Sequence, residues 1–194
     1  MRLCVAVLFS ILLLPSFAQA ADKNMRFGLM PIVSRYDIND PIGPTQSGSD
    51  VTPLSGVLIF DAGRDGRVFV HAYSTYFQVT ASTTDIGQKV KQNGLNASYQ
   101  TMFRLTRSIK PWFGLGLGYA SERYQERHRI TSGGFLAPGS PYASRSVENI
   151  TAVINASHEW QYNRNFDIGL HLQYEQPISG DGASAARLGF YVVY

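Results

Sequence analysis

An alternation of side chains over the last nine residues constrains this chain more than any other feature. One set occupies every second position and ends on an aromatic residue at the chain end: Ala186, Leu188, Phe190, Val192 and Tyr194. The intervening set is Arg187, Gly189, Tyr191 and Val193. Because successive side chains of a strand point to opposite faces, the pattern predicts a strand with one continuous apolar face.

The same period of two recurs along the chain and predicts eight strands of similar length. Their approximate ranges are 25–38, 54–63, 67–81, 95–108, 112–126, 147–162, 166–177 and 185–194. The faces are clearest from Leu95 to Leu105, from Phe113 to Tyr119 and from Phe166 to Tyr174, where large apolar side chains oppose polar residues or glycine. We therefore expect an all-β fold.

The predicted connections alternate strictly between short and long. Short ones carry Gly, Pro or Asn, as tight turns require, and cover 63–66, 108–111 and 162–165. Longer polar segments lie between them, at 39–53, 82–94, 127–145 and 178–184. This asymmetry indicates that the two ends of the sheet differ.

The N-terminus has the pattern of a secretory signal peptide. Arg2 precedes an apolar run from Val5 to Leu14, and residues 17–20 offer a small-x-small cleavage pattern before Ala21. We expect residues 1–20 to be removed, which leaves residues 21–194 as one domain. The only cysteine, Cys4, is lost with them, so the mature chain has no disulfide and no thiolate metal site. We expect neither a metal nor a cofactor, and a net charge of only +3 does not indicate nucleic-acid binding.

The aromatic closing strand, the even number of strands and the alternating connections together resemble small outer-membrane barrels of Gram-negative bacteria, namely the OmpA transmembrane domain and the OmpX and OmpW types. The resemblance implies an eight-stranded antiparallel up-and-down transmembrane β-barrel, with both termini in the periplasm. It also implies that the barrel-assembly machinery reads the last strand, with Phe190, Val192 and Tyr194 as the signal.

A soluble alternative remains open at this stage. The segments Val57–Phe60 and Val68–Val70 are apolar on both faces, so the register of two strands is ambiguous. A soluble β-sandwich or a lipocalin-like barrel accommodates such strands equally well.

A barrel of eight strands has an interior just wide enough for side chains to fill it. Residues of mixed charge are predicted there: Arg104, Glu122, Glu159, Asp167, His171, Glu175 and Arg187. Because buried charges need partners, we expect an internal polar network that plugs the barrel, with Glu175 and Arg187 as one ion pair.

The third long connection is the most distinctive surface segment. It carries basic residues followed by apolar ones, and the candidate interaction residues are Arg123, Arg127, Arg129, Phe135, Leu136 and Tyr142. Two interpretations are equal: an apolar tip for another envelope or surface protein, or arginines that pair with the phosphates of lipopolysaccharide.

Catalysis is not expected. The lipid A palmitoyltransferase and deacylase families place Ser, His and an acid at the membrane rim, but here His71 and Ser74 point to opposite faces of a strand. We expect a non-enzymatic barrel with an interaction or scaffolding role, embedded among outer-membrane lipids. The alternative is a narrow conduit, similar to OmpW, for small hydrophobic solutes.

We predict that the mature chain folds only in detergent micelles or a bilayer, because its apolar face needs a non-aqueous surround. Gel mobility of unheated and boiled samples measures this, and we expect two different mobilities. A monomer that folds in water and shows a single mobility contradicts the prediction.

Overall fold

The computed structural model describes residues 24–38, 46–79, 89–106, 109–125, 144–163, 166–179 and 181–194. The strands are β1 (Met25–Ile38), β2 (Gln46–Asp61), β3 (Gly66–Val79), β4 (Lys89–Met102), β5 (Trp112–Tyr124), β6 (Arg145–Gln161), β7 (Asp167–Pro177) and β8 (Ala183–Val193). They form one closed barrel in which each strand pairs with its sequence neighbours and β8 pairs with β1, all antiparallel. This confirms the predicted fold class.

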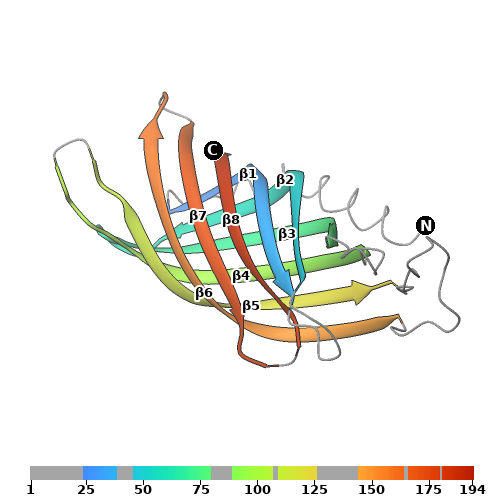
Figure 1. The fold of residues 1–194 in the computed structure, drawn as a ribbon. Coiled ribbons are helices and arrows are strands. Elements are labelled where there is room, and N and C mark those ends of the chain that lie inside the picture. Colours follow the sequence, from blue (N-terminus) through green and yellow to red (C-terminus); the bar gives the residue numbers. More distant parts are fainter. Residues whose placement is uncertain are drawn as a thin grey trace, which may run out of the picture.

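Closure rests on the pairing of β8 with β1, from Gly28–Val193 to Ile38–Ala183 (Figure 1). The amide of Tyr194 donates to the carbonyl of Phe27 at 2.9 Å, and the amide of Phe27 donates back to Tyr194 at 3.1 Å. The Tyr194 ring also contacts Phe27 and Phe166, with centroids 6.0 and 5.4 Å away. We call the end of the barrel that holds Met25 and Tyr194 the terminal end, and the opposite end the loop end.

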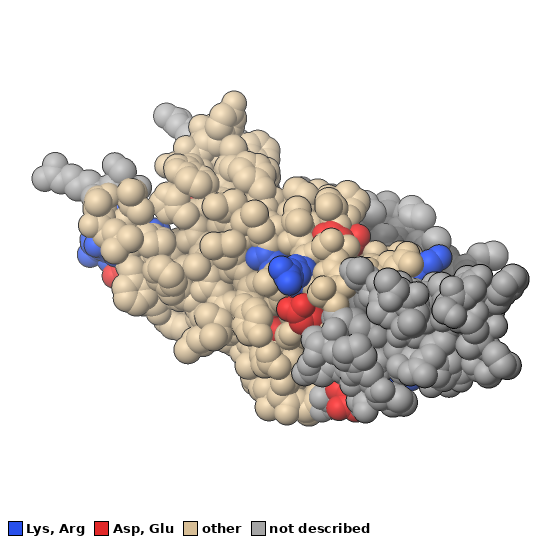
Figure 2. Space-filling model, viewed as in Figure 1, with Lys and Arg blue, Asp and Glu red and all other residues tan. Residues whose placement is uncertain are grey.

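The apolar faces predicted from the sequence point outward. Leu115 is 69% exposed and Leu117 is 60% exposed, while Gly114 and Gly118 at the alternate positions are buried inside the barrel. In the space-filling view the visible face is mostly uncharged, and its few charged side chains gather at the left tip and beside the grey atoms (Figure 2). Since so large an apolar band does not suit water, the soluble sandwich is wrong for this chain.

No helix among the described residues is long and apolar enough to cross a bilayer. The ambiguous register of the second and third strands is resolved: Val57, Ile59 and Phe69 are buried inside the barrel, and Phe60 is exposed on the outside.

Two of the strands predicted from the sequence have the wrong limits. β2 begins at Gln46 rather than near residue 54, and β4 spans Lys89–Met102 rather than 95–108. Both strands extend toward the loop end through polar residues such as Ser47 and Lys91, which pair with Asp37 and Tyr76. Beyond an apolar band, a paired strand has no need of apolar side chains on its outer face, so the period-two signal disappears while the hydrogen bonding continues.

β2 contains one residue more than either of its neighbours accommodates. Pairing with β1 jumps from Met30–Ser55 to Ile32–Thr52, and pairing with β3 jumps from Gly56–Ala72 to Ser49–Gln78. Pro53 and Leu54 are both exposed between buried Thr52 and Ser55, so the strict alternation is broken there. Pro53 has no amide hydrogen to donate, which makes it a tolerated residue at such a bulge.

Candidate functional site

The interior of the barrel holds two ionic networks, one at the terminal end and one that runs from mid-barrel toward the loop end. In the first, the Arg26 guanidinium at the terminal end reaches three carboxylates from three other strands. Its Nη1 donates to Asp167 at 2.8 Å and to Glu159 at 3.2 Å, and its Nη2 donates to Asp61 at 3.1 Å. Charge compensation of this kind is what allows an arginine to lie inside a barrel.

Arg67 completes this terminal network and is fully buried. Its Nη1 donates to Glu159 at 2.5 Å, its Nε donates to Gln100 at 2.6 Å, and its Nη2 donates to Ser157 at 2.7 Å. The guanidinium carbon also lies 4.1 Å from the centroid of the Trp112 ring. Glu159 therefore bridges two arginines, and the planar fork of Arg67 has a partner on every side.

The second network, at mid-barrel, is centred on Glu175. The predicted ion pair with Arg187 is present at 2.5 Å, with both side chains 1% exposed. The Glu175 carboxylate also accepts from the Tyr73 hydroxyl at 2.8 Å and from the amide of Asn96. Arg187 in turn donates to Gln92 at 2.8 Å and lies over the Tyr73 ring.

This central network continues toward the loop end through Gln92 and Glu122. The Gln92 amide donates to Glu122 at 2.9 Å, and Glu122 also accepts from the backbone amide of Ala183 at 3.2 Å and from the Tyr124 hydroxyl. Beside it, the rings of Tyr36 and Phe77 stack with centroids 3.8 Å apart. A buried apolar cluster surrounds this stack and includes Ile38, Val90, Tyr124, Ala183 and Ala185.

Several of these contacts cross the barrel between opposite walls. Gln92 on β4 contacts Arg187 on β8, Tyr73 on β3 contacts Glu175 on β7, and the Phe69 ring of β3 stacks on His171 of β7 at 4.4 Å. In a ring of eight strands these pairs of strands face each other across the centre. Direct side-chain contacts between opposing walls therefore block the interior at these levels.

His71 and Ser55 form a hydrogen-bonded pair at 3.0 Å, but the pair is buried inside the barrel and the Ser55 hydroxyl donates to the carbonyl of Met30. Ser74 lies outside and donates to Asn93 at 2.7 Å. His158 packs edge-on against Trp160 with centroids 4.5 Å apart. In the described parts of the chain, no group of three or more His, Cys, Asp or Glu side chains is placed to hold a metal ion.

The predicted interior residues fall in three places. Glu122, His171, Glu175 and Arg187 are buried inside, and Glu159 and Asp167 lie partly buried in the terminal network. The prediction for Arg104 is wrong. This residue follows the end of β4, its side chain is 51% exposed, and it pairs with exposed Asp65 at 2.7 Å. The strand ends before Arg104, so its place in the alternation no longer directs it inward.

The predicted surface and assembly residues are only partly within the described chain. Arg123 is exposed on the outer face of β5, and Phe190, Val192 and Tyr194 lie on the outer face of the closing strand. The remaining loop candidates, Arg127, Arg129, Phe135, Leu136 and Tyr142, lie outside the described residues.

Sequence reasoning missed the residues that hold these networks together. Arg26 and Arg67 lie at the start of their strands, and Arg67 belongs to a strand whose register was ambiguous from the sequence. Gln92 lies outside the predicted fourth strand altogether. Continuing the alternation of Asn96, Ser98 and Gln100 backward by four residues would have found Gln92, because it occupies the same face.

This architecture has counterparts among known proteins. No family model matches the chain, and no curated protein does. Among solved structures, the chain is similar to the outer membrane protein OprG of Pseudomonas aeruginosa, with a TM-score of 0.51, 10% identity, and coverage of 88% of this chain and 93% of OprG. It is also similar to Ail, the attachment invasion locus protein of Yersinia pestis, with a TM-score of 0.50, 13% identity, and coverage of 88% and 98%. The fold is that of the small eight-stranded outer-membrane β-barrels.

We predict that Arg187→Met lowers the free energy of unfolding by about 3–5 kcal/mol, because it leaves the Glu175 carboxylate buried without its counter-charge. The double variant Glu175→Gln with Arg187→Met recovers much of that loss. Urea unfolding in detergent micelles, followed by tryptophan fluorescence, measures both.

The matched control is Asp65→Asn, which removes the carboxylate of the exposed pair with Arg104 and is expected to change stability by less than about 1 kcal/mol. A single Arg187→Met variant as stable as the wild type contradicts the central role of this pair.

Proposed function

We propose that this chain is an integral outer-membrane barrel that conducts no ions and acts through its surface loops, as an interaction or scaffolding protein of the cell envelope. The observation that carries the proposal is the blocked interior. Side chains from opposing walls meet at 2.8 Å both at Gln92–Arg187 and at Tyr73–Glu175, and each charge there has a partner. An interior of this kind serves stability rather than passage.

The distribution of outward residues supports a membrane position with the loop end exposed. Along the β4–β5 ladder, opposite pairs change from charged Lys91–Arg123 through polar Asn93–Ser121 to apolar Leu95–Tyr119. At the terminal end, the outward aromatic residues include Phe27, Trp160, Phe166 and Tyr194, which suits an interfacial belt. Both termini then lie on the periplasmic side.

Catalysis has no support in the described residues, where no hydroxyl, histidine and acid converge at the outer rim. We assign the role to the loops instead. The interior is plugged, and the outer face becomes polar toward the loop end. Ail, the attachment invasion locus protein of Yersinia pestis, has the same fold.

We predict that the purified mature protein gives no steady conductance in planar bilayers and that it captures a partner from solubilised outer membrane through its third long loop. Deletion of residues 127–143 is expected to abolish capture while heat-modifiable mobility is retained, since it leaves the β5–β6 ladder intact up to the Tyr124–Arg145 pair. Steady conductance that changes in Glu175→Gln contradicts the proposal.

A second function is favoured by one specific observation, the bulge in β2. Paired positions are interrupted between β2 residues Asp50–Ser55 and β3 residues Tyr73–Phe77, so this stretch of wall lacks a continuous ladder. The interruption lies at the level of the Ser74–Asn93 and Tyr76–Lys91 pairs, at the loop-end border of the apolar band, and such a stretch suits a site that opens. The second candidate is therefore a lateral route through this wall for small hydrophobic solutes.

Deletion of Pro53 tests the second candidate. The deletion removes the extra residue, so both ladders of β2 regain a continuous register and the wall is fully paired. If the route exists, uptake of a small apolar fluorophore into vesicles that contain the protein falls to the level of empty vesicles. Uptake that is equal for the wild type, the deletion variant and empty vesicles contradicts it.

A further inference from the structure

The outer face of the barrel carries a pair of like charges at the loop end. Lys91 on β4 and Arg123 on β5 lie directly opposite each other, and both are exposed. Like charges at opposed positions of an antiparallel ladder destabilise the sheet unless something compensates them. No ion pair with either residue is found within the described part of the chain, whereas Arg35, on the same rim, lies 4.0 Å from Asp37.

The described residues around the pair carry a net positive charge. Lys89 precedes Lys91 by two positions on the same face, and one acid, Glu148, lies on β6 opposite Ser121. The three cations exceed this acid, and the Lys91–Arg123 pair is flanked on its other sides by the uncharged residues Tyr76 and Ser146. The site therefore favours an anion with more than one negative charge.

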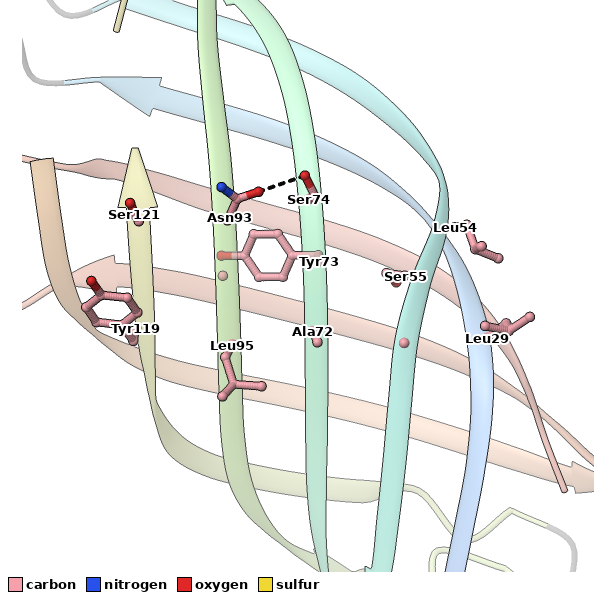
Figure 3. Close-up of a pocket in the computed structure, with 12 residues that line it drawn as sticks. Leu29, Leu54, Ser55, Ala72, Tyr73, Ser74, Asn93, Leu95, Tyr119 and Ser121 are labelled. Carbon is pink, nitrogen blue, oxygen red and sulfur yellow. Dashed lines mark hydrogen bonds between the residues drawn. The ribbon is translucent and has the colours of Figure 1, made fainter. Parts of the chain in front are cut away.

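Below this pair, toward mid-barrel, a groove of about 490 Å³ lies along the outer wall (Figure 3). One row of paired positions crosses it: Leu29, Gly56, Ala72, Leu95 and Tyr119. The two small residues form its floor, where large side chains are absent, and the leucines and the tyrosine form its sides. Leu54, next to the bulge, adds a further apolar side chain.

Between the cations and the groove lies a rung of hydrogen-bonding groups. Ser74 donates to Asn93 at 2.7 Å, and Ser121 lies opposite Asn93 on β5 (Figure 3). From the rim toward mid-barrel, the surface thus presents cations, then uncharged polar groups, then an apolar groove. This is the order of groups in a phosphorylated glycolipid: phosphate, sugar and amide, acyl chain.

We propose that this surface binds a phosphate-bearing glycolipid of the outer leaflet, of the lipopolysaccharide class. Its phosphate lies between Lys91 and Arg123, its sugar and amide groups face Asn93 and Ser121, and one acyl chain lies in the groove over Gly56 and Ala72. The assignment rests on the proposed orientation, which places the loop end in the outer leaflet. It is independent of whether the barrel conducts or binds a protein partner.

The experiment measures affinity of the full mature protein in detergent micelles for three probes: diphosphorylated lipid A, the same lipid A after phosphatase treatment, and phosphatidylglycerol. We expect the first to bind at least about tenfold more tightly than either of the others, because two cations meet a multiply charged phosphate. The double variant Lys91→Gln with Arg123→Gln is expected to lose that preference.

Two further variants separate charge from shape. Arg64→Gln with Lys110→Gln removes the same two charges from exposed positions at the terminal end, and it is expected to bind as the wild type does. Ala72→Phe fills the groove on its outer face, and it is expected to weaken all acylated probes while the charges remain.

Three results overturn the proposal. They are equal binding of phosphatidylglycerol and diphosphorylated lipid A, unchanged binding in the Lys91 and Arg123 double variant, and equal losses in the two double variants. Heat-modifiable mobility of each variant shows that it has folded. None of these results bears on bilayer conductance or on partner capture by the loop, so failure here leaves the proposed function standing.

Discussion

Closure of the sheet by backbone hydrogen bonds is the constraint on which the rest of this structure depends. In hydrocarbon, an unpaired amide or carbonyl is unfavourable by several kcal/mol, so a sheet that crosses a bilayer needs its edges paired. Here the two edges are β1 and β8, and they join from Gly28–Val193 to Ile38–Ala183. Tyr194 adds the last pair of hydrogen bonds with Phe27.

Closure with eight strands forces the second feature, a narrow interior that must be filled. Side chains from every wall meet near the axis, and glycine makes room where they crowd: a Cβ at Gly118 would collide with Asn96 and Thr151. The filling combines two apolar clusters with polar and charged side chains, and the buried charges require partners. The result is the chain of contacts from Glu122 through Gln92 and Arg187 to Glu175.

The bulge in β2 is a place where the pairing of the closed sheet is interrupted. A single extra residue interrupts pairing with both neighbouring strands, and Gly56 and Ala72 leave the outer wall thin beside it. The same region lies directly below Lys91 and Arg123, which have no ion-pair partner among the described residues. An irregular strand, a groove and a pair of like charges thus coincide on one side of the barrel, whereas the interior pair of Glu175 and Arg187 is compensated.

The sequence by itself determined the class of fold and the position of most strands, since period-two alternation is a local property of each strand and the closing strand shows it without exception. It also determined the Glu175–Arg187 pair, because the two residues share a face near the ends of adjacent strands. It misplaced the loop-end limits of β2 and β4, where outward residues no longer need to be apolar.

Only the tertiary structure determined which side chains bond to each other across the interior of the barrel. The bonds of Arg26 and Arg67 to Glu159 join residues more than ninety positions apart, and that distance depends on strand tilt and stagger rather than on any local pattern. The same holds for the groove, because Leu29, Ala72 and Tyr119 become neighbours only through the register of five strands. Registers are set by the whole closed sheet, and no segment of the sequence contains them.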